Sequence, residues 1–302
     1  MDITVSENPD GSIHVEYYSY VPSAPAAWAF VVLFGITTVA HFFMMFPMRA
    51  AYFIPLILGG ICEAFGYYGR SWSHRKPDDM KPWIMQELLI LCAPPLISAT
   101  IYMILGRIIR SLQAEHHSMV RTKWLTAIFV LNDIVCFCTQ IGGAGVQITG
   151  DDRIMKIGQK AVLGGLILSL VVYLLFIATA ARFHVRLARE PTPIVRDNPR
   201  LRWRRYLVAL YVECVAVFLR NLVRAIEYSQ GTRGFIADHE AMLYVFDAFL
   251  MFLTLLLLLG FHPGLLIKRA RRVASSEGVY GTLLSEGVET SQINLAEYNR
   301  EK

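Results

Sequence analysis

The sequence predicts an all-α membrane protein, a bundle of seven transmembrane helices. Composition is the first observation: 55% of the 302 residues are hydrophobic and 18% are charged, against about 25% charged in soluble domains. The second is the presence of long apolar runs separated by short polar segments. The third is an uneven distribution of Lys and Arg between alternate loops, which predicts an outside N-terminus and a cytosolic C-terminus.

Each predicted helix is an apolar run of roughly the 20 residues that a bilayer core requires. The second run is the shortest, and the first and last are the clearest. The seven predicted spans are residues 25–46, 51–70, 82–106, 124–147, 158–182, 204–228 and 241–266.

These spans divide the chain into an extracellular segment 1–24, a membrane domain 25–266 and a cytosolic tail 267–302, basic at first and then expected to be disordered after about residue 273. The first segment contains no Lys or Arg, so we expect no cleavable signal, and the first span itself should direct insertion. The loop between spans two and three is the weakest part of the orientation, because Arg75, Lys76 and Lys81 lie on the predicted outer side.

Charged and polar residues recur at helical spacing inside the spans. In the sixth span Glu213, Arg220, Arg224 and Glu227 share one face, and the seventh span repeats the pattern. Ionisable groups inside a membrane are costly and mark functional sites. The residues expected to bind a substrate are Glu63, Tyr67, Arg70, Gln86, Asp133, Gln140, Arg220, Arg224, Glu227, Glu240, Tyr244 and Asp247.

The spacing predicts that Arg220 or Arg224 pairs with Asp247, Glu227 or Glu240, because a short connection should make the last two spans neighbours. We expect a charged pocket that opens toward the outer leaflet. The alternative is that these pairs only hold the helices together, since polar contacts between spans contribute about 0.6 kcal/mol each. So many charges at one depth of the membrane favour a binding site over contacts that only hold the helices together.

Other motifs favour packing over chemistry. Pro94–Pro95 predicts a kink in the third span, static rather than a hinge, and the glycine pairs predict close helix approach. No P-loop, serine-hydrolase motif, H-x-x-x-H pair or seventh-span lysine is present. We therefore expect no catalytic residues, metal or cofactor, and the scattered basic clusters argue against nucleic acid.

Several of these motifs resemble a known family. They are E-x-x-G-Y-x-x-R from Glu63, Gln86 with Ala93–Pro94, the IYMILGR run, Phe183–His184 with Arg186, and the charged block from Arg220 to Asp247. The pattern resembles the fungal seven-helix lipid-translocating exporters, of the sphingoid long-chain-base exporter and aminocholesterol-resistance type. Val223 departs from the phenylalanine usual there.

The resemblance implies export or flip of amphiphilic lipids at the plasma membrane, resistance to toxic amphiphiles, and a fungal source. Its partners would be membrane lipids and an amphiphilic small molecule. The alternative is a seven-helix receptor or sensor of a lipid, which the topology and the basic loop after the fifth span suit. Against that alternative, no D-R-Y-like triplet ends the third span and no N-P-x-x-Y occurs in the seventh.

Overall fold

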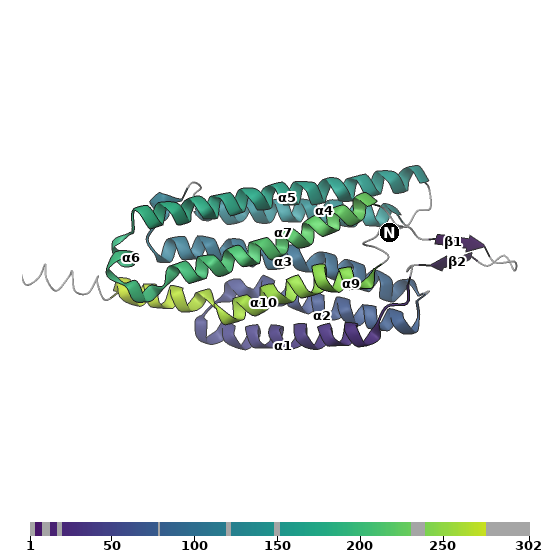
Figure 1. Ribbon diagram of the computed structural model, residues 1–302, viewed down its shortest axis with the longest axis horizontal. Helices are drawn as coiled ribbons and strands as arrows, with labels where there is room; N and C mark the ends of the chain where they lie inside the picture. Colours follow the sequence, from purple (N-terminus) through teal and green to yellow (C-terminus); the bar gives the residue numbers. More distant parts are fainter. Residues whose placement is uncertain are drawn as a thin grey trace, which may run out of the picture.

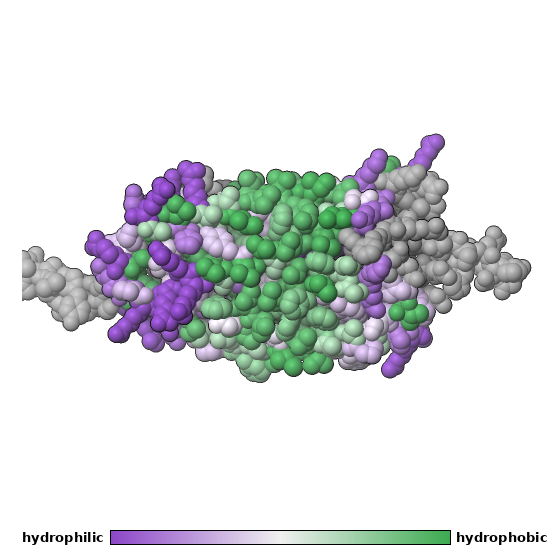
Figure 2. Space-filling view, viewed as in Figure 1, coloured by the Kyte–Doolittle hydropathy of each residue, from purple (hydrophilic) through white to green (hydrophobic). Residues whose placement is uncertain are grey.

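The computed structural model describes residues 4–7, 13–16, 20–77, 79–118, 122–147, 152–230 and 239–275. In this part of the chain, seven helical segments are long and apolar enough to cross a membrane, which confirms the predicted fold class. The long helices run side by side along the long axis of the molecule (Figure 1). On the face seen in Figure 2, an apolar belt lies between two hydrophilic ends. The protein is an integral, multi-pass membrane protein.

The first spans are α1 (Ala24–Met48), the 3₁₀ turn η1 (Ala51–Phe53) with α2 (Ile54–Arg75), and α3 (Met80–Ser111). A second 3₁₀ turn, η2 (Glu115–His117), precedes α4 (Thr122–Gln147), which is followed by α5 (Asp152–Arg189). The predicted spans correspond to these helices, which extend beyond the predicted limits by a few residues and, for α5, by a full turn or more at each end.

Short α6 (Pro193–Asp197) and η3 (Pro199–Leu201) connect α5 to α7 (Trp203–Gln230). The seventh span is composite. It consists of α9 (Glu240–Leu243), the π-helical turn η4 (Tyr244–Phe249) and α10 (Leu250–Gly260), followed by helical residues 263–275. The turn expected between the last two spans, and most of the tail expected to be disordered, lie outside the described residues.

A β-hairpin that the sequence analysis did not foresee precedes the bundle. Strand β1 (Thr4–Glu7) pairs antiparallel with β2 (Ile13–Glu16), and Val5 lies opposite Val15. The hairpin lies at the same end of the molecule as α9, while α6 lies at the other end (Figure 1).

The helices form a ring in chain order, closed by contact between α10 and α1. Helix α7 also contacts α3 across the ring, so these two helices occupy the centre. Burial agrees with this placement: 61% of the most apolar stretch of α3 is buried, against 22% for α1. The outer helices expose large apolar side chains such as Phe43 and Leu131, as a lipid-facing surface requires.

Helix α2 approaches α3 closely because glycines line its contact face. A Cβ added at Gly66 would lie 2.7 Å from Cγ1 of Ile90, and one at Gly59 would lie 2.9 Å from Cγ1 of Ile97. Neither position has space for a larger residue, which is the packing role expected for membrane glycines. This approach fixes α2, and with it Glu63, against the centre of the bundle.

Candidate functional site

A buried carboxylate joins the two arginines of α7. Nε of Arg220 donates to Oδ1 of Asp247 at 2.7 Å, and an Nη2 hydrogen of Arg224 reaches Oδ2 at 2.6 Å. The arginines share a face of α7 because they are four residues apart. All three side chains are buried, so the opposite charges compensate one another where water cannot.

Glu227 completes this charged group at its edge. It accepts from Nη1 of Arg224 at 3.3 Å, an i,i+3 pair within α7. Two carboxylates therefore face two guanidinium groups. The structure thus confirms the predicted pairing of the α7 arginines with Asp247 and Glu227.

The π-helical turn η4 places Asp247 in this group. A π turn contains an additional residue and so rotates the side chains that follow it relative to a regular α-helix. Glu240 and Tyr244, expected on the same face as Asp247, instead face Arg70 of α2. Such turns are frequent at functional sites, and the spacing of polar residues did not reveal this one.

Arg70 is the centre of a second group, nearer to the hairpin end. Its Nη2 donates to Oε1 of Glu240 and to the hydroxyl of Tyr20, both at 2.9 Å, and its Nε donates to the hydroxyl of Tyr244 at 3.1 Å. Glu240 also accepts from the main-chain N–H of Ser23 at 2.7 Å. Glu240 therefore connects the entry to α1 with α2, and Arg70 rather than an α7 arginine is its partner.

Gln86 of α3 lies between the two groups. Its side-chain oxygen accepts from Nη1 of Arg70 at 3.5 Å, and its nitrogen donates to Glu87 at 3.4 Å. Gln86 is fully buried. The predicted polar stripes of α2, α3 and the seventh span thus meet inside the bundle.

A fully buried carboxylate, Glu63, lies near the charged group of α7. It lies within electrostatic range of Asp247, Arg220 and Arg224. Within the described part of the chain, neither oxygen of Glu63 has a hydrogen-bond partner, and the hydroxyl of Tyr67 has none either. The Tyr67 ring stacks on Phe34 with a centroid separation of 5.7 Å. Glu63 is thus an acidic group without a donor in a setting of aromatic rings and ion pairs.

Asp133 and Gln140 of α4 line small cavities beside Arg220. A cavity of about 20 Å³ is bordered by Asp133, Gln140, Ser98 and Arg220, and another of about 10 Å³ by Gln140, Glu87 and Arg224. A water molecule requires about 10–15 Å³ by this measure. Both cavities, bordered by residues that the structure describes, are of water size and smaller than a lipid headgroup.

Three hydrogen-bonding groups of the site are uncharged, and the pattern of charged residues in the sequence did not predict them. They are Tyr20, the main chain of Ser23 and the carbonyl of Ile90, which accepts from Nη2 of Arg220 at 3.1 Å. A signal for the last was present in the sequence. Pro94 has no N–H to bond the carbonyl four residues earlier, so Ile90 is left with a free acceptor.

The family model described as "RTA1 like protein" matches residues 56–270, well over half of the chain. The chain belongs to the RTA1-like family. The resemblance drawn from the charged motifs is thereby confirmed, and the matched range contains every residue predicted for the site. No solved structure is detectably similar to this RTA1-like protein.

Three Saccharomyces cerevisiae relatives illustrate the RTA1-like family. Protein RTM1 is 30% identical over 278 residues, covering 79% of this chain and 89% of the relative. Protoporphyrin uptake protein 1 is 31% identical, with the same coverage. Sphingoid long-chain base transporter RSB1 is 25% identical over 286 residues, covering 83% of this chain and 74% of the relative.

Proposed function

We propose that this protein transports amphiphilic, lipid-like molecules across its membrane and thereby protects the cell from toxic amphiphiles. We place it in the plasma membrane. Two relatives are named for the movement of a sphingoid base and of protoporphyrin. Both molecules combine a large apolar body with ionisable groups, so a protein that moves them has to stabilise a charge inside the bilayer.

The observation that carries this proposal is the setting of Glu63. A buried carboxylate without a donor loses its hydration without compensation. The ammonium head of a long-chain base supplies both the opposite charge and three N–H donors. In our proposal such a head binds Glu63, while the apolar chain lies among the aromatic side chains or extends into the lipid.

The α7 arginines have a different role in this proposal. Arg220 and Arg224 already pair with Asp247 and Glu227, so their charges are compensated. They provide a fixed electrostatic framework close to Glu63. Tyr67, Arg70, Gln86, Asp133, Gln140, Glu240 and Tyr244 complete the polar path that we propose for the headgroup.

Transport requires the bundle to open. The two cavities that described residues form between α3, α4, α5 and α7 are of water size, so in our proposal these helices separate to admit the amphiphile. In our proposal α3 bends at Pro94–Pro95, where its hydrogen-bond ladder is broken, so this kink acts as a hinge and not as the static kink expected from the sequence. While α3 bends, the ion pairs of Arg220 and Arg224 with Asp247 hold α7 against the seventh span.

The test is flux of a sphingoid base in proteoliposomes that contain the purified protein. A fluorophore at the end of the apolar chain leaves the ammonium free, and quenching by an impermeant reagent reports which leaflet holds the molecule. We expect the wild type to accelerate translocation and Glu63→Gln to abolish the acceleration. Glu213→Gln is the matched control, because Glu213 of α7 is equally buried but lies closer to the opposite end of the bundle.

The outcomes separate the hypotheses. Tight binding of the base with no translocation would favour a sensor and contradict transport. Undiminished flux in Glu63→Gln, at equal protein level and equal thermal stability, would contradict the role of Glu63.

A further inference from the structure

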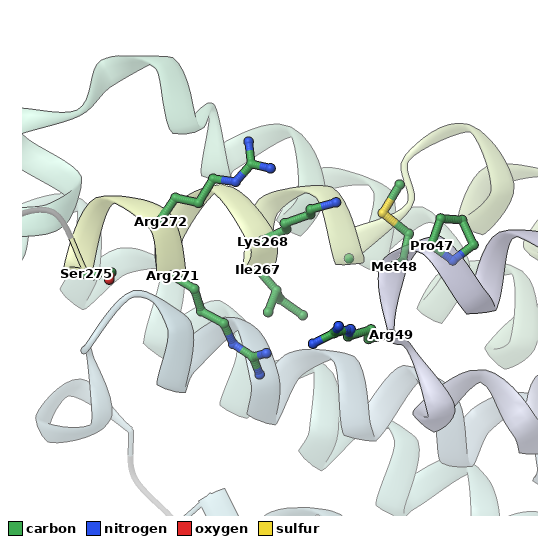
Figure 3. Close-up of a pocket in the computed structure, with 9 residues that line it drawn as sticks. Pro47, Met48, Arg49, Ile267, Lys268, Arg271, Arg272 and Ser275 are labelled. Atoms are coloured by element: carbon green, nitrogen blue, oxygen red, sulfur yellow. The ribbon is translucent and has the colours of Figure 1, made fainter.

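A basic cavity lies at the end of the bundle away from the Arg70 group, where α1 ends and residues 263–275 form the last helix. Its volume is about 510 Å³. Four cationic side chains line it: Arg49 from the end of α1, and Lys268, Arg271 and Arg272 from the last helix. Met48 and Ile267 contribute apolar surface to the same cavity (Figure 3). We call it the basic cavity.

The charges of the basic cavity are concentrated and unbalanced. The guanidinium groups of Arg49 and Arg271 point toward one another across it (Figure 3). No acidic residue of the described chain forms an ion pair with any of the four cations. Like charges held at one place repel each other, and an anion between them removes this repulsion.

The backbone holds these side chains in place. Arg49 adopts the left-handed conformation, with φ of 47°, and its N–H bonds back to the carbonyl of Phe46 at 3.0 Å. This conformation is uncommon for residues other than glycine. Gly264 allows the last helix to approach α1, because an added Cβ would lie 3.1 Å from Cβ of Met48.

The position of the basic cavity identifies its environment. Arg49 directly follows the 25 residues of α1, which span about 37 Å at 1.5 Å per residue. A bilayer core of about 30 Å therefore ends close to Arg49, at the level of lipid phosphates. Arg pairs with phosphate in a bidentate geometry, and the volume lies within the range of about 300–1,000 Å³ typical of ligand sites.

We propose that the basic cavity binds the phosphate-bearing headgroup of an anionic membrane lipid. Four cations suit a headgroup with more than one phosphate, such as a phosphoinositide. The apolar surface of Met48 and Ile267 would contact the glycerol end of the lipid, which favours a lipid over a free phosphate. This site is separate from Glu63, and neither proposal depends on the other.

The experiment measures the affinity of the full-length protein in phosphatidylcholine nanodiscs for a short-chain phosphatidylinositol bisphosphate. Inositol trisphosphate and inorganic phosphate are titrated in parallel. The test variant is Arg49→Gln/Arg271→Gln. The control is Arg189→Gln/Arg200→Gln, which removes the same charge from exposed positions at the end of α5 and in η3. Circular dichroism and thermal unfolding show whether each variant folds.

We expect the test variant to bind the phosphoinositide about thirtyfold more weakly, since each basic group at an anionic surface accounts for a change of about fivefold. The control should change affinity by less than half as much on a logarithmic scale. Equal losses in both variants would overturn the proposal, because they would indicate only general surface charge. Binding of inositol trisphosphate but not of the lipid would assign the cavity to a soluble polyphosphate and overturn the lipid assignment. Should the test variant fail to fold, the single variants Arg271→Gln and Lys268→Gln each remove one charge and should each weaken binding about fivefold.

Discussion

Arg220 of α7 donates a hydrogen bond to the main-chain carbonyl of Ile90 in α3, at 3.1 Å. In an unbroken helix that carbonyl would accept from the residue four positions later, which is Pro94 and has no N–H. The proline thus makes available the acceptor that the buried guanidinium requires. The kink of α3 and the placement of the charge in α7 are parts of one arrangement.

Replacing Pro94 with alanine is expected to weaken this arrangement. The new N–H competes for the Ile90 carbonyl, so a hydrogen bond to a charged donor, worth about 1.5–3 kcal/mol, is exchanged for a neutral one worth about 0.5–1.5 kcal/mol. Thermal unfolding in detergent should therefore show a small loss of stability. Pro95→Ala, which removes the neighbouring proline but leaves Pro94 in place, is the control. Equal or higher stability in Pro94→Ala than in Pro95→Ala would refute the link between Pro94 and Arg220.

Removing the charge of Asp247 should be severely destabilising. In Asp247→Asn, Arg220 and Arg224 lose the carboxylate that joins them, and breaking a buried ion pair in this way costs about 3–5 kcal/mol. We expect low yield of folded protein by size-exclusion chromatography. Adding Arg220→Gln to Asp247→Asn removes the charge that Asp247→Asn leaves uncompensated, since Arg224 keeps Glu227, and should restore part of the yield. No restoration by the double variant would argue against charge compensation as the cause.

Glu240→Gln should be milder and local. Arg70 keeps its bonds to Tyr20 and Tyr244, and the amide oxygen of Gln can still accept from the N–H of Ser23. The expected cost is about 1.5–3 kcal/mol, the range for a hydrogen bond to a charged group. Hydrogen exchange should increase at residues 20–24 and remain unchanged in α7. Faster exchange throughout the bundle would show that the Arg70 group supports more than the entry to α1.

Gly66→Ala tests the close approach of α2 to α3. The added Cβ would lie 2.7 Å from Cγ1 of Ile90, so the helices must separate or the isoleucine must move, at a cost of about 1–3 kcal/mol. Gly35→Ala in α1 is the matched control, because no described atom lies within 4 Å of its added Cβ. Gly35→Ala should leave the melting temperature unchanged or raise it slightly. A melting temperature for Gly66→Ala equal to that of Gly35→Ala would show that the contact is easily relaxed.

The sequence predicted the helices well because their signal is local. A run of about 20 apolar residues is enough to identify a span, whatever its neighbours. The orientation, with the N-terminus outside and the C-terminus in the cytosol, rests on the distribution of Lys and Arg and stays a prediction. The N-terminal hairpin was not predicted because its two strands are only four residues long and lie in a polar segment, which gives no long apolar signal.

The charged stripes were also visible in the sequence, since residues three, four or seven apart share a helix face. The sequence left open which carboxylate pairs with the α7 arginines. Asp247, Glu227 and Glu240 were all candidates for the α7 arginines, and the choice depended on the π-helical turn, which begins at Tyr244 and contains Asp247. Periodicity assumes a regular helix, so it does not locate such a turn.

What the amino-acid sequence alone determined is the set of membrane helices and the presence of charges on their inner faces, because hydrophobicity and helical period act within a single segment. Only the tertiary structure decided which charges pair, that Glu63 has no donor within the described residues, and that the cations of α1 and the last helix surround one cavity. These features depend on side chains from different segments meeting in space. Packing between helices determines such meetings, and packing is a property of the whole bundle.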